Sequence, residues 1–202
     1  NPNNPTASIV PEEIIEEIAK SSSAIVVVDE AYREFYGKSS LPLLNKFKNL
    51  VILRSLSKFA AMAGARIGYL VSNQFLSQKF DSIRFPMGVS YFSYKFAEIV
   101  LENDRSWIKQ QIKMIKKERV LMGKKLENFG FYVFPSAANF LLVKIGKRAK
   151  EVCRKLKQRG IIVRDRSSKK YLSGCVRITV RSPKENKLLI NQLKEVLYDA
   201  KD

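Results

Sequence analysis

Two short apolar runs, residues 50–53 and 67–71, flank a segment rich in hydroxyl and cationic side chains. Each run is short and continuous, which is typical of a buried strand. Four polar side chains lie between the runs: Ser55, Ser57, Lys58 and, eight residues after the lysine, Arg66. Because ligands of open α/β sheets bind beyond the carboxyl ends of strands, this segment is a candidate site. Two hydroxyls and a guanidinium suit a phosphate, and a lysine can form a Schiff base.

Because the chain is strongly basic, each cation of this segment has an alternative interpretation. It can simply be part of a solvated basic loop that binds no ligand. The chain has 37 Lys and Arg against 19 Asp and Glu in 202 residues, so its formal net charge is +18. Such a charge is compatible with nucleic-acid or membrane-surface binding. However, the cations are spread along the chain, and the dense cluster at 109–125 also has apolar residues at helical spacing. We therefore interpret that cluster as the solvated face of a helix, and nucleic-acid binding as unlikely.

Several function classes are excluded or disfavoured by composition. The chain contains no histidine, which excludes histidine-based triads and removes the commonest metal ligand, so no metal site is expected. The sequence contains no run of 18 apolar residues, so no transmembrane helix is expected. Cys153 and Cys175 are expected to be reduced thiols in a cytoplasmic protein.

The hydrophobic pattern alternates between strand and helix periods. Strands are predicted at 24–28, 50–53, 67–71, 131–134, 139–145, 161–163 and 176–180. Helices are predicted after Ser8 or Pro11, with Ile14, Ile15 and Ile18 on one face, and at 74–84, 90–102, 106–128, 147–158 and 183–198. The fold class is therefore α/β. We expect a mostly parallel sheet with helices within residues 1–105, a long interdomain helix at 106–130, and a small α+β domain at 131–202.

Asp29 ends the most apolar predicted strand, 24–28. A carboxylate at that place is costly unless it is paired, which favours a ligand-binding role. The alternative is a helix N-cap, a common role of aspartate. Polar groups also occur at the other strand ends and in the first loop: Asn4, Tyr32, Ser55, Ser57, Lys58 and Arg66. Pyridoxal phosphate needs a lysine for its aldehyde, a carboxylate for its ring nitrogen, donors for its phenolic oxygen and a phosphate cradle, and this set provides each of them.

Three motifs resemble the fold-type-I pyridoxal-phosphate aminotransferases: Asn-Pro-Asn-Asn-Pro-Thr at 1–6, Asp-Glu-Ala-Tyr at 29–32, and Ser-Leu-Ser-Lys at 55–58 with Arg66. The segments 136–140, 160–165 and 172–180 are similar to the histidinol-phosphate aminotransferase family. The resemblance covers essentially the whole chain. Family members begin well upstream, so the chain is expected to correspond to a C-terminal portion with an incomplete large domain. It departs from the family at Ala7 and Arg181, where the family usually has glycine.

The resemblance implies a role for each matching residue. Lys58 would hold pyridoxal 5'-phosphate as an internal aldimine and move the substrate proton. Asp29 would pair with the pyridine nitrogen, and Asn4 and Tyr32 would hydrogen-bond the phenolic oxygen. The phosphate would be held by Ser55, Ser57 and Arg66. Substrate-binding roles fall to Arg164, Arg177 and Asn139.

The implied reaction is transamination of L-histidinol phosphate with 2-oxoglutarate, a step of histidine biosynthesis, in a homodimeric cytoplasmic enzyme. In this reaction 2-oxoglutarate would accept the amino group and become glutamate. The alternatives within the family are a threonine-phosphate decarboxylase and an aromatic aminotransferase. Outside it, the alternatives are a basic nucleic-acid-binding fragment and a catalytically inactive fragment.

Overall fold

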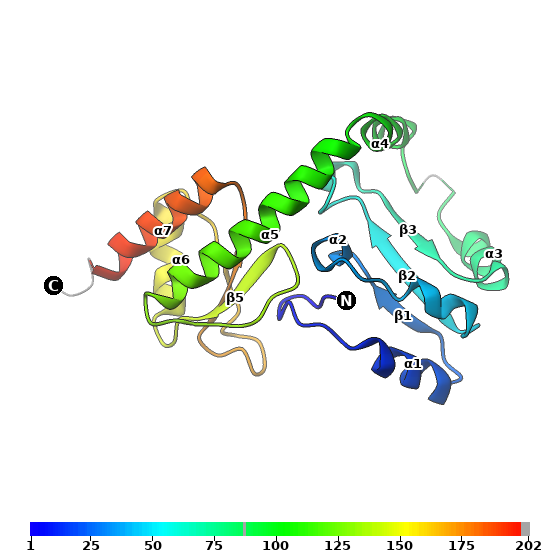
Figure 1. The fold of residues 1–202 in the computed structure, drawn as a ribbon, viewed down its shortest axis with the longest axis horizontal. Helices are drawn as coiled ribbons and strands as arrows, with labels where there is room; N and C mark the ends of the chain where they lie inside the picture. The colour runs from blue at the N-terminus through cyan, green and yellow to red at the C-terminus, as the bar shows by residue number, and fades with distance from the viewer. Residues whose placement is uncertain (87, 199–202) are drawn as a thin grey trace. The chain divides into compact units, whose positions relative to one another are not determined.

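The computed structural model describes residues 1–86 and 88–198 (Figure 1). The chain forms two compact units, the first made of residues 1–2 and 9–112 and the second of residues 3–8 and those from 113 onward. The division falls within α5 (Arg105–Glu127), the long helix predicted at 106–128. The domain limits expected from the sequence, 105 and 130, remain a prediction.

The first unit is built on a three-stranded sheet in the order β1-β2-β3. Its strands are β1 (Val26–Asp29), β2 (Leu50–Ser55) and β3 (Gly68–Val71). β1 runs parallel to β2, with Asp29 paired to Leu53, whereas β3 runs antiparallel to β2, with Gly68 paired to Ser55. The α/β class is confirmed, and the three strands make one parallel and one antiparallel pair.

Burial within this sheet differs from the expectation of three buried strands. In the central strand β2, Leu50 and Ile52 are fully buried. β1 and β3 are edge strands of the described sheet, and Val27 on β1 is 52% exposed while Tyr69 on β3 is 46% exposed. The predictions of buried strands at 24–28 and 67–71 are therefore wrong in burial. A continuous apolar run predicts a strand, but its burial depends on elements far along the chain.

Two helices of the first unit, α3 (Gln74–Ile83) and α4 (Tyr91–Asn103), begin at residues whose side chains cap them, whereas α1 (Glu12–Ser21) has no side-chain cap. α1 follows Pro11, α3 is capped by Asn73, and α4 is capped by Ser90. The Asn73 Oδ1 atom accepts from Leu76 N–H at 3.0 Å, and Ser90 Oγ accepts from Ser93 N–H at 3.1 Å. The unit also contains the short α2 (Arg33–Tyr36), η1 (Leu41–Asn45) and η2 (Ala63–Ala65), which the sequence did not predict.

One face of α1 packs against the sheet through Ile15, which is buried beside Val28, Leu43 and Leu50. Ile14 and Ile18, predicted to share a face with Ile15, are both more than 40% exposed. The three isoleucines span about 100° of the helix circumference, and of them only Ile15 belongs to the buried cluster beside the sheet.

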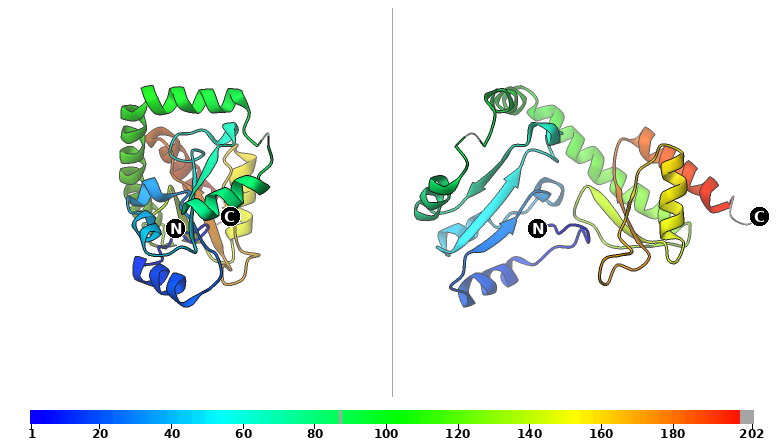
Figure 2. Two further views of the ribbon diagram at one scale, coloured as in Figure 1. Left: turned by 90° about the vertical axis from the view of Figure 1, so that its right-hand side faces the viewer. Right: turned by 180° about the vertical axis from the view of Figure 1, so that it is seen from behind.

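The second unit is an antiparallel sheet in the order β4-β5-β7-β6 with helices on one face (Figure 2). Its strands are β4 (Tyr132–Val133), β5 (Phe140–Lys144), β6 (Arg164–Asp165) and β7 (Cys175–Thr179). α6 (Ala149–Gln158) and α7 (Pro183–Tyr198) bury Val152, Leu156 and Leu193 together with Leu141 and Ile178 of the sheet. The prediction of a strand at 161–163 is wrong, because the pairing with β7 begins at Arg164.

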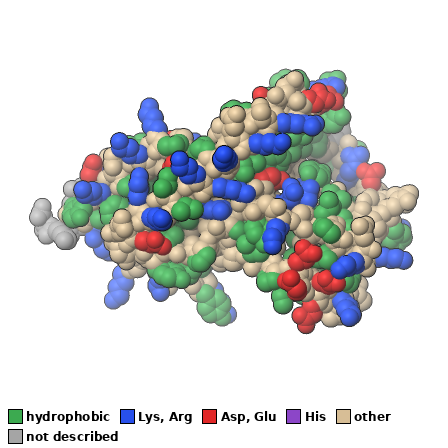
Figure 3. All heavy atoms as spheres, viewed as in Figure 1, with side chains coloured by type: hydrophobic (Ala, Val, Ile, Leu, Met, Phe, Trp, Pro, Cys, Tyr) green, Lys and Arg blue, Asp and Glu red, His purple; other side chains and the backbone are tan. Residues whose placement is uncertain are grey.

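Lys and Arg side chains are spread over much of the face shown in Figure 3, as the even distribution of cations along the sequence predicted. None of the helices in the described part of the chain combines the length and apolar character that crossing a bilayer requires.

Candidate functional site

A closed loop after β2 presents the predicted lysine. The Leu56 N–H donates to the Ile67 carbonyl at 3.2 Å, and Ser55 Oγ donates to the same carbonyl at 3.3 Å. Ser55 Oγ also accepts from the Ser57 N–H at 3.1 Å. These bonds join the end of β2 to the start of β3, so the chain from 56 to 66 projects as one loop beyond the sheet.

Apolar side chains pack this loop against α4. Leu56, Ala60 and Met62 are at most 4% exposed and pack with Ala97 and Val100 of α4. Lys58, in contrast, is exposed. The loop is therefore fixed by its apolar residues while its lysine amine stays accessible.

Arg66 ends the loop in a conformation that few non-glycine residues adopt. Its φ is +55°, in the left-handed region, and its guanidinium Nη1 donates to the Ala63 carbonyl at 3.3 Å. Backbone strain of this kind occurs often at ligand sites, where the surrounding structure holds it in place. Arg66 therefore belongs to the same loop as Lys58.

The ends of the parallel strands β1 and β2 meet at one edge of the sheet, which brings Tyr32 toward Lys58. The Lys58 Nζ atom lies 6.0 Å from the centre of the Tyr32 ring. The first unit contains six of the seven residues predicted to hold the cofactor: Asp29, Tyr32, Ser55, Ser57, Lys58 and Arg66.

Asp29 is the last residue of β1, and its side chain is exposed. Its Oδ1 atom accepts from the Ala31 N–H at 2.9 Å, which closes a local turn. The N-cap of α2 is Tyr32, so the alternative that Asp29 caps this helix is wrong. The argument that burial alone makes this carboxylate costly is also wrong, because the side chain is accessible.

Two arginines lie opposite each other on neighbouring strands of the second unit. Arg164 on β6 is the register partner of Arg177 on β7, so both side chains emerge on the same face. The Arg177 guanidinium lies 5.2 Å from the Phe140 ring, and its Nη1 donates to Asn4 Oδ1 at 2.8 Å. Like charges directly opposite each other disfavour pairing, so this place suits an anion.

Asn4 thus lies in the second unit with Arg177, and the structure does not place it in the unit of Lys58. Asn139 is half-buried just before β5, and its carbonyl accepts from the Val180 N–H at 2.9 Å. Arg181, the departure from the family pattern, is ion-paired with Glu185 at 2.6 Å in the first turn of α7.

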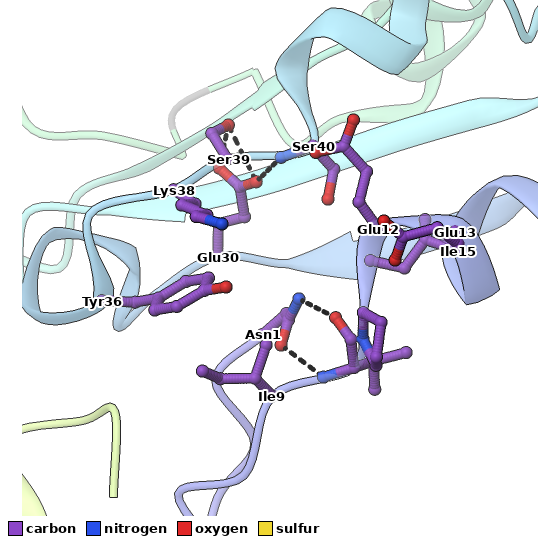
Figure 4. Close-up of a pocket in the computed structure, with 12 residues that line it drawn as sticks. Asn1, Ile9, Glu12, Glu13, Ile15, Glu30, Tyr36, Lys38, Ser39 and Ser40 are labelled. Carbon is purple, nitrogen blue, oxygen red and sulfur yellow. Dashed lines mark hydrogen bonds between the residues drawn. The ribbon is translucent and has the colours of Figure 1, made fainter.

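Sequence reasoning missed the buried Glu30 and the partly buried Arg54, which form an ion pair at the ends of β1 and β2 with a nitrogen–oxygen distance of 3.0 Å. The available signal was a charged residue on each strand directly beside a predicted site residue. Figure 4 shows a pocket of about 420 Å³ on the Glu30 side of β1. Its lining residues come from 1, 9–15 and 30–40 and include none of the ten predicted site residues.

Comparison with known proteins gives consistent matches along the chain. A family model described as aminotransferase class I and II matches residues 1–193. A histidinol-phosphate aminotransferase of Caldanaerobacter subterraneus is 42% identical over 198 residues, and one of Thermoanaerobacter sp. strain X514 is 44% identical over 198 residues. Both alignments cover 98% of this chain and 56% of the relative, so the chain spans little more than half their length.

Solved structures agree with these matches. Histidinol-phosphate aminotransferase from Sinorhizobium meliloti, in complex with pyridoxal-5'-phosphate, is similar with a TM-score of 0.89 at 31% identity, covering 98% of this chain and 56% of that one. A threonine-phosphate decarboxylase from Porphyromonas gingivalis has a TM-score of 0.85 at 26% identity, covering 98% of this chain and 63% of that one.

Proposed function

Because the chain belongs to the class I and II aminotransferase family, we propose that its protein transfers the amino group of L-histidinol phosphate to 2-oxoglutarate, using pyridoxal 5'-phosphate. The observation that carries the proposal is the accessible Lys58 on a closed loop after β2, with its Nζ 6.0 Å from the Tyr32 ring. The similarity to histidinol-phosphate aminotransferases at 42–44% identity supports the choice of donor.

The residues of the first unit fit this cofactor by their chemistry. A lysine amine, a carboxylate on the adjacent parallel strand and a phenol face one edge of the sheet, and the Lys58 loop adds two hydroxyls and a guanidinium. When bound, the cofactor acts as an electron sink that stabilises a carbanion at the substrate's α-carbon.

Each side chain then has a distinct task. Lys58 Nζ would bind the cofactor aldehyde and, once the substrate amine has displaced it, the freed amine would accept the proton that leaves the α-carbon. The Asp29 carboxylate would keep the ring nitrogen protonated, and the Tyr32 hydroxyl would donate to the phenolic oxygen. Ser55, Ser57 and Arg66 hold the phosphate, since hydroxyls and a guanidinium match its oxygens.

The second unit contributes anion recognition in this proposal. Arg164 and Arg177 bind the phosphate or carboxylate end of the two substrates in turn, and Asn4 orients the Arg177 guanidinium through the 2.8 Å hydrogen bond. Asn139 stays a candidate substrate contact. A homodimeric, cytoplasmic enzyme and glutamate as the product of the acceptor are further parts of the proposal.

A phosphothreonine decarboxylase is the second candidate, because a solved enzyme of that class has a TM-score of 0.85. It would use the same cofactor residues and the same anion site. Release of CO₂ from threonine phosphate, without net amino transfer, would support this candidate over the aminotransferase.

The proposal is tested by identifying the lysine that binds the cofactor. The complete protein is mixed with pyridoxal phosphate, reduced with borohydride and digested, and the labelled peptide is identified by mass spectrometry. We expect the label on Lys58 and its loss in Lys58→Ala. Lys48 is the matched control, because it is also exposed but lies before the amino end of β2. Label on Lys48, or label that persists in Lys58→Ala, would contradict the proposed role.

A further inference from the structure

An ion pair between the buried Glu30 and the partly buried Arg54 joins the ends of β1 and β2. Glu30 directly follows β1 and is only 2% exposed. The Arg54 Nε atom on β2 donates to Glu30 Oε2 at 3.0 Å. The Glu30 N–H donates to the Leu53 carbonyl at 2.8 Å, which extends the ladder one residue past the Asp29–Leu53 pair. The two charges therefore lie side by side where the parallel strands end.

The rest of the carboxylate is also satisfied. The Ser40 N–H donates to Glu30 Oε1 at 2.7 Å, and Ser39 Oγ lies 2.9 Å from each carboxylate oxygen (Figure 4). Arg54 Nη2 donates to Ser39 Oγ at 2.8 Å. Burial disfavours the charge on Arg54, but its hydrogen bonds to Tyr69 and Glu30 raise its pKa. Hydrogen bonds to both oxygens of one carboxylate hold these residues in one geometry.

The network lies on the opposite face of the sheet from the candidate site. Side chains alternate between the two faces along a strand, so Asp29 points away from the face of Glu30, and Ser55 points away from the face of Arg54. The pair on one face therefore fixes the main-chain segments that present Asp29 and Ser55 on the other. Because the loop of Lys58 starts at Ser55, its origin is fixed by the same pair.

We propose that Glu30 and Arg54 are positioning residues for the cofactor site, and that their ion pair sets the spacing between Asp29 and the loop that carries Lys58. The inference rests on the proposed function. It differs from a purely stabilising role, which would change the folded fraction and leave the cofactor's environment in the folded protein unchanged.

The test substitutes Glu30→Gln in the complete protein, which removes the charge and keeps the size. Pyridoxal phosphate is titrated into folded protein, and the absorbance of the bound cofactor is followed against pH. We expect the Kd to rise roughly tenfold, since groups that orient a binding residue commonly contribute that much, and the pH midpoint of the absorbance change to move. Leu43→Ala is the matched control, because Leu43 is 1% exposed in the core beneath the same sheet and its side chain has no charge and no hydrogen-bonding group.

Equal Kd and pH midpoint in Glu30→Gln and Leu43→Ala, with normal binding by the unaltered protein, would overturn the inference alone. Failure of the unaltered protein to bind the cofactor at Lys58 would overturn the proposed function and this inference with it. If Glu30→Gln does not fold, Arg54→Lys decides, because it keeps the charge and loses the guanidinium fork. A folded Arg54→Lys protein with unchanged Kd and midpoint would also overturn the inference.

Discussion

Gly174 lies where the backbone of the second unit leaves no room for a side chain. Its φ is +71°, and a Cβ atom built on it would lie 2.8 Å from the Cα and 2.9 Å from the carbonyl oxygen of Gly146. The Gly174 carbonyl accepts from the Ile145 and Gly146 N–H groups. Two chain segments therefore meet at this point through their backbones alone.

We expect Gly174→Ala to lower the free energy of unfolding by more than about 2 kcal/mol, because the overlap with Gly146 adds to the cost of a left-handed alanine. Gly160→Ala is the matched control, since Gly160 has φ +77° with no atom within 4 Å of the added Cβ. It should lose only about 1 kcal/mol. Urea unfolding measures both, and equal losses would contradict the steric argument.

The thiol of Cys153 provides a prediction on pH. Burial, and then the charge of Asp165, raises its pKa to about 11. A raised pKa in the folded state stabilises the protein below the unfolded thiol's pKa, and this contribution disappears as pH rises toward 11. The free energy of unfolding should therefore fall more steeply in the unaltered protein than in Cys153→Ala between about pH 8.5 and 11. Parallel pH curves from urea titrations would contradict this.

At the scale of elements, strand pairing brings together residues that are distant in sequence. β6 has only two residues, yet its pairing with β7 places Arg164 opposite Arg177, thirteen residues further along the chain. Asn4, from the first loop, reaches the same guanidinium. The candidate anion site thus combines residues from three separate segments, one of which is a short edge strand.

Inorganic phosphate should stabilise the protein through this site. We expect added phosphate to raise Tm by differential scanning fluorimetry, because an anion relieves the repulsion between the paired arginines. Arg177→Ala should abolish the increase. Lys169→Ala is the matched control, since Lys169 is an exposed cation in the loop between β6 and β7, and it should retain the increase. Equal behaviour of the two variants would show that bulk positive charge explains the effect.

At the scale of the whole molecule, the first unit exposes much apolar surface. On the sheet, Val27 is 52% exposed beside Leu53 at 38%. On α4, Tyr91 and Phe92 are 76% and 84% exposed. Soluble proteins rarely leave contiguous surfaces of this kind uncovered.

Residues 1–202 expressed by themselves should therefore bind the dye ANS and self-associate in size-exclusion chromatography. The double change Tyr91→Ser and Phe92→Ser should reduce both signals, because it removes two of the exposed rings of α4. Tyr171→Ser is the control, since Tyr171 is 89% exposed in the second unit. A monodisperse, ANS-negative sample of the unaltered chain would contradict the prediction.

The sequence by itself determined the limits of the longer helices and which residues are candidates for the site. α3, α4 and α7 begin and end within one residue of their predicted limits, because caps such as Asn73 and Ser90 act on backbone groups only a few residues away. The motif at 55–58 predicts Lys58 as a candidate cofactor lysine for the same reason, since the chemistry of the motif is contained in a few consecutive residues.

Only the tertiary structure decided which strands lie at an edge, where β6 begins, that Asn4 contacts Arg177, and that Glu30 pairs with Arg54. The physical reason is the separation along the chain. Burial of a strand and the partner of a charge depend on segments tens of residues away, and the local pattern of apolar residues has no information about which segment that is. Glu30 and Arg54 are 24 residues apart, and only the parallel register of β1 and β2 makes them neighbours.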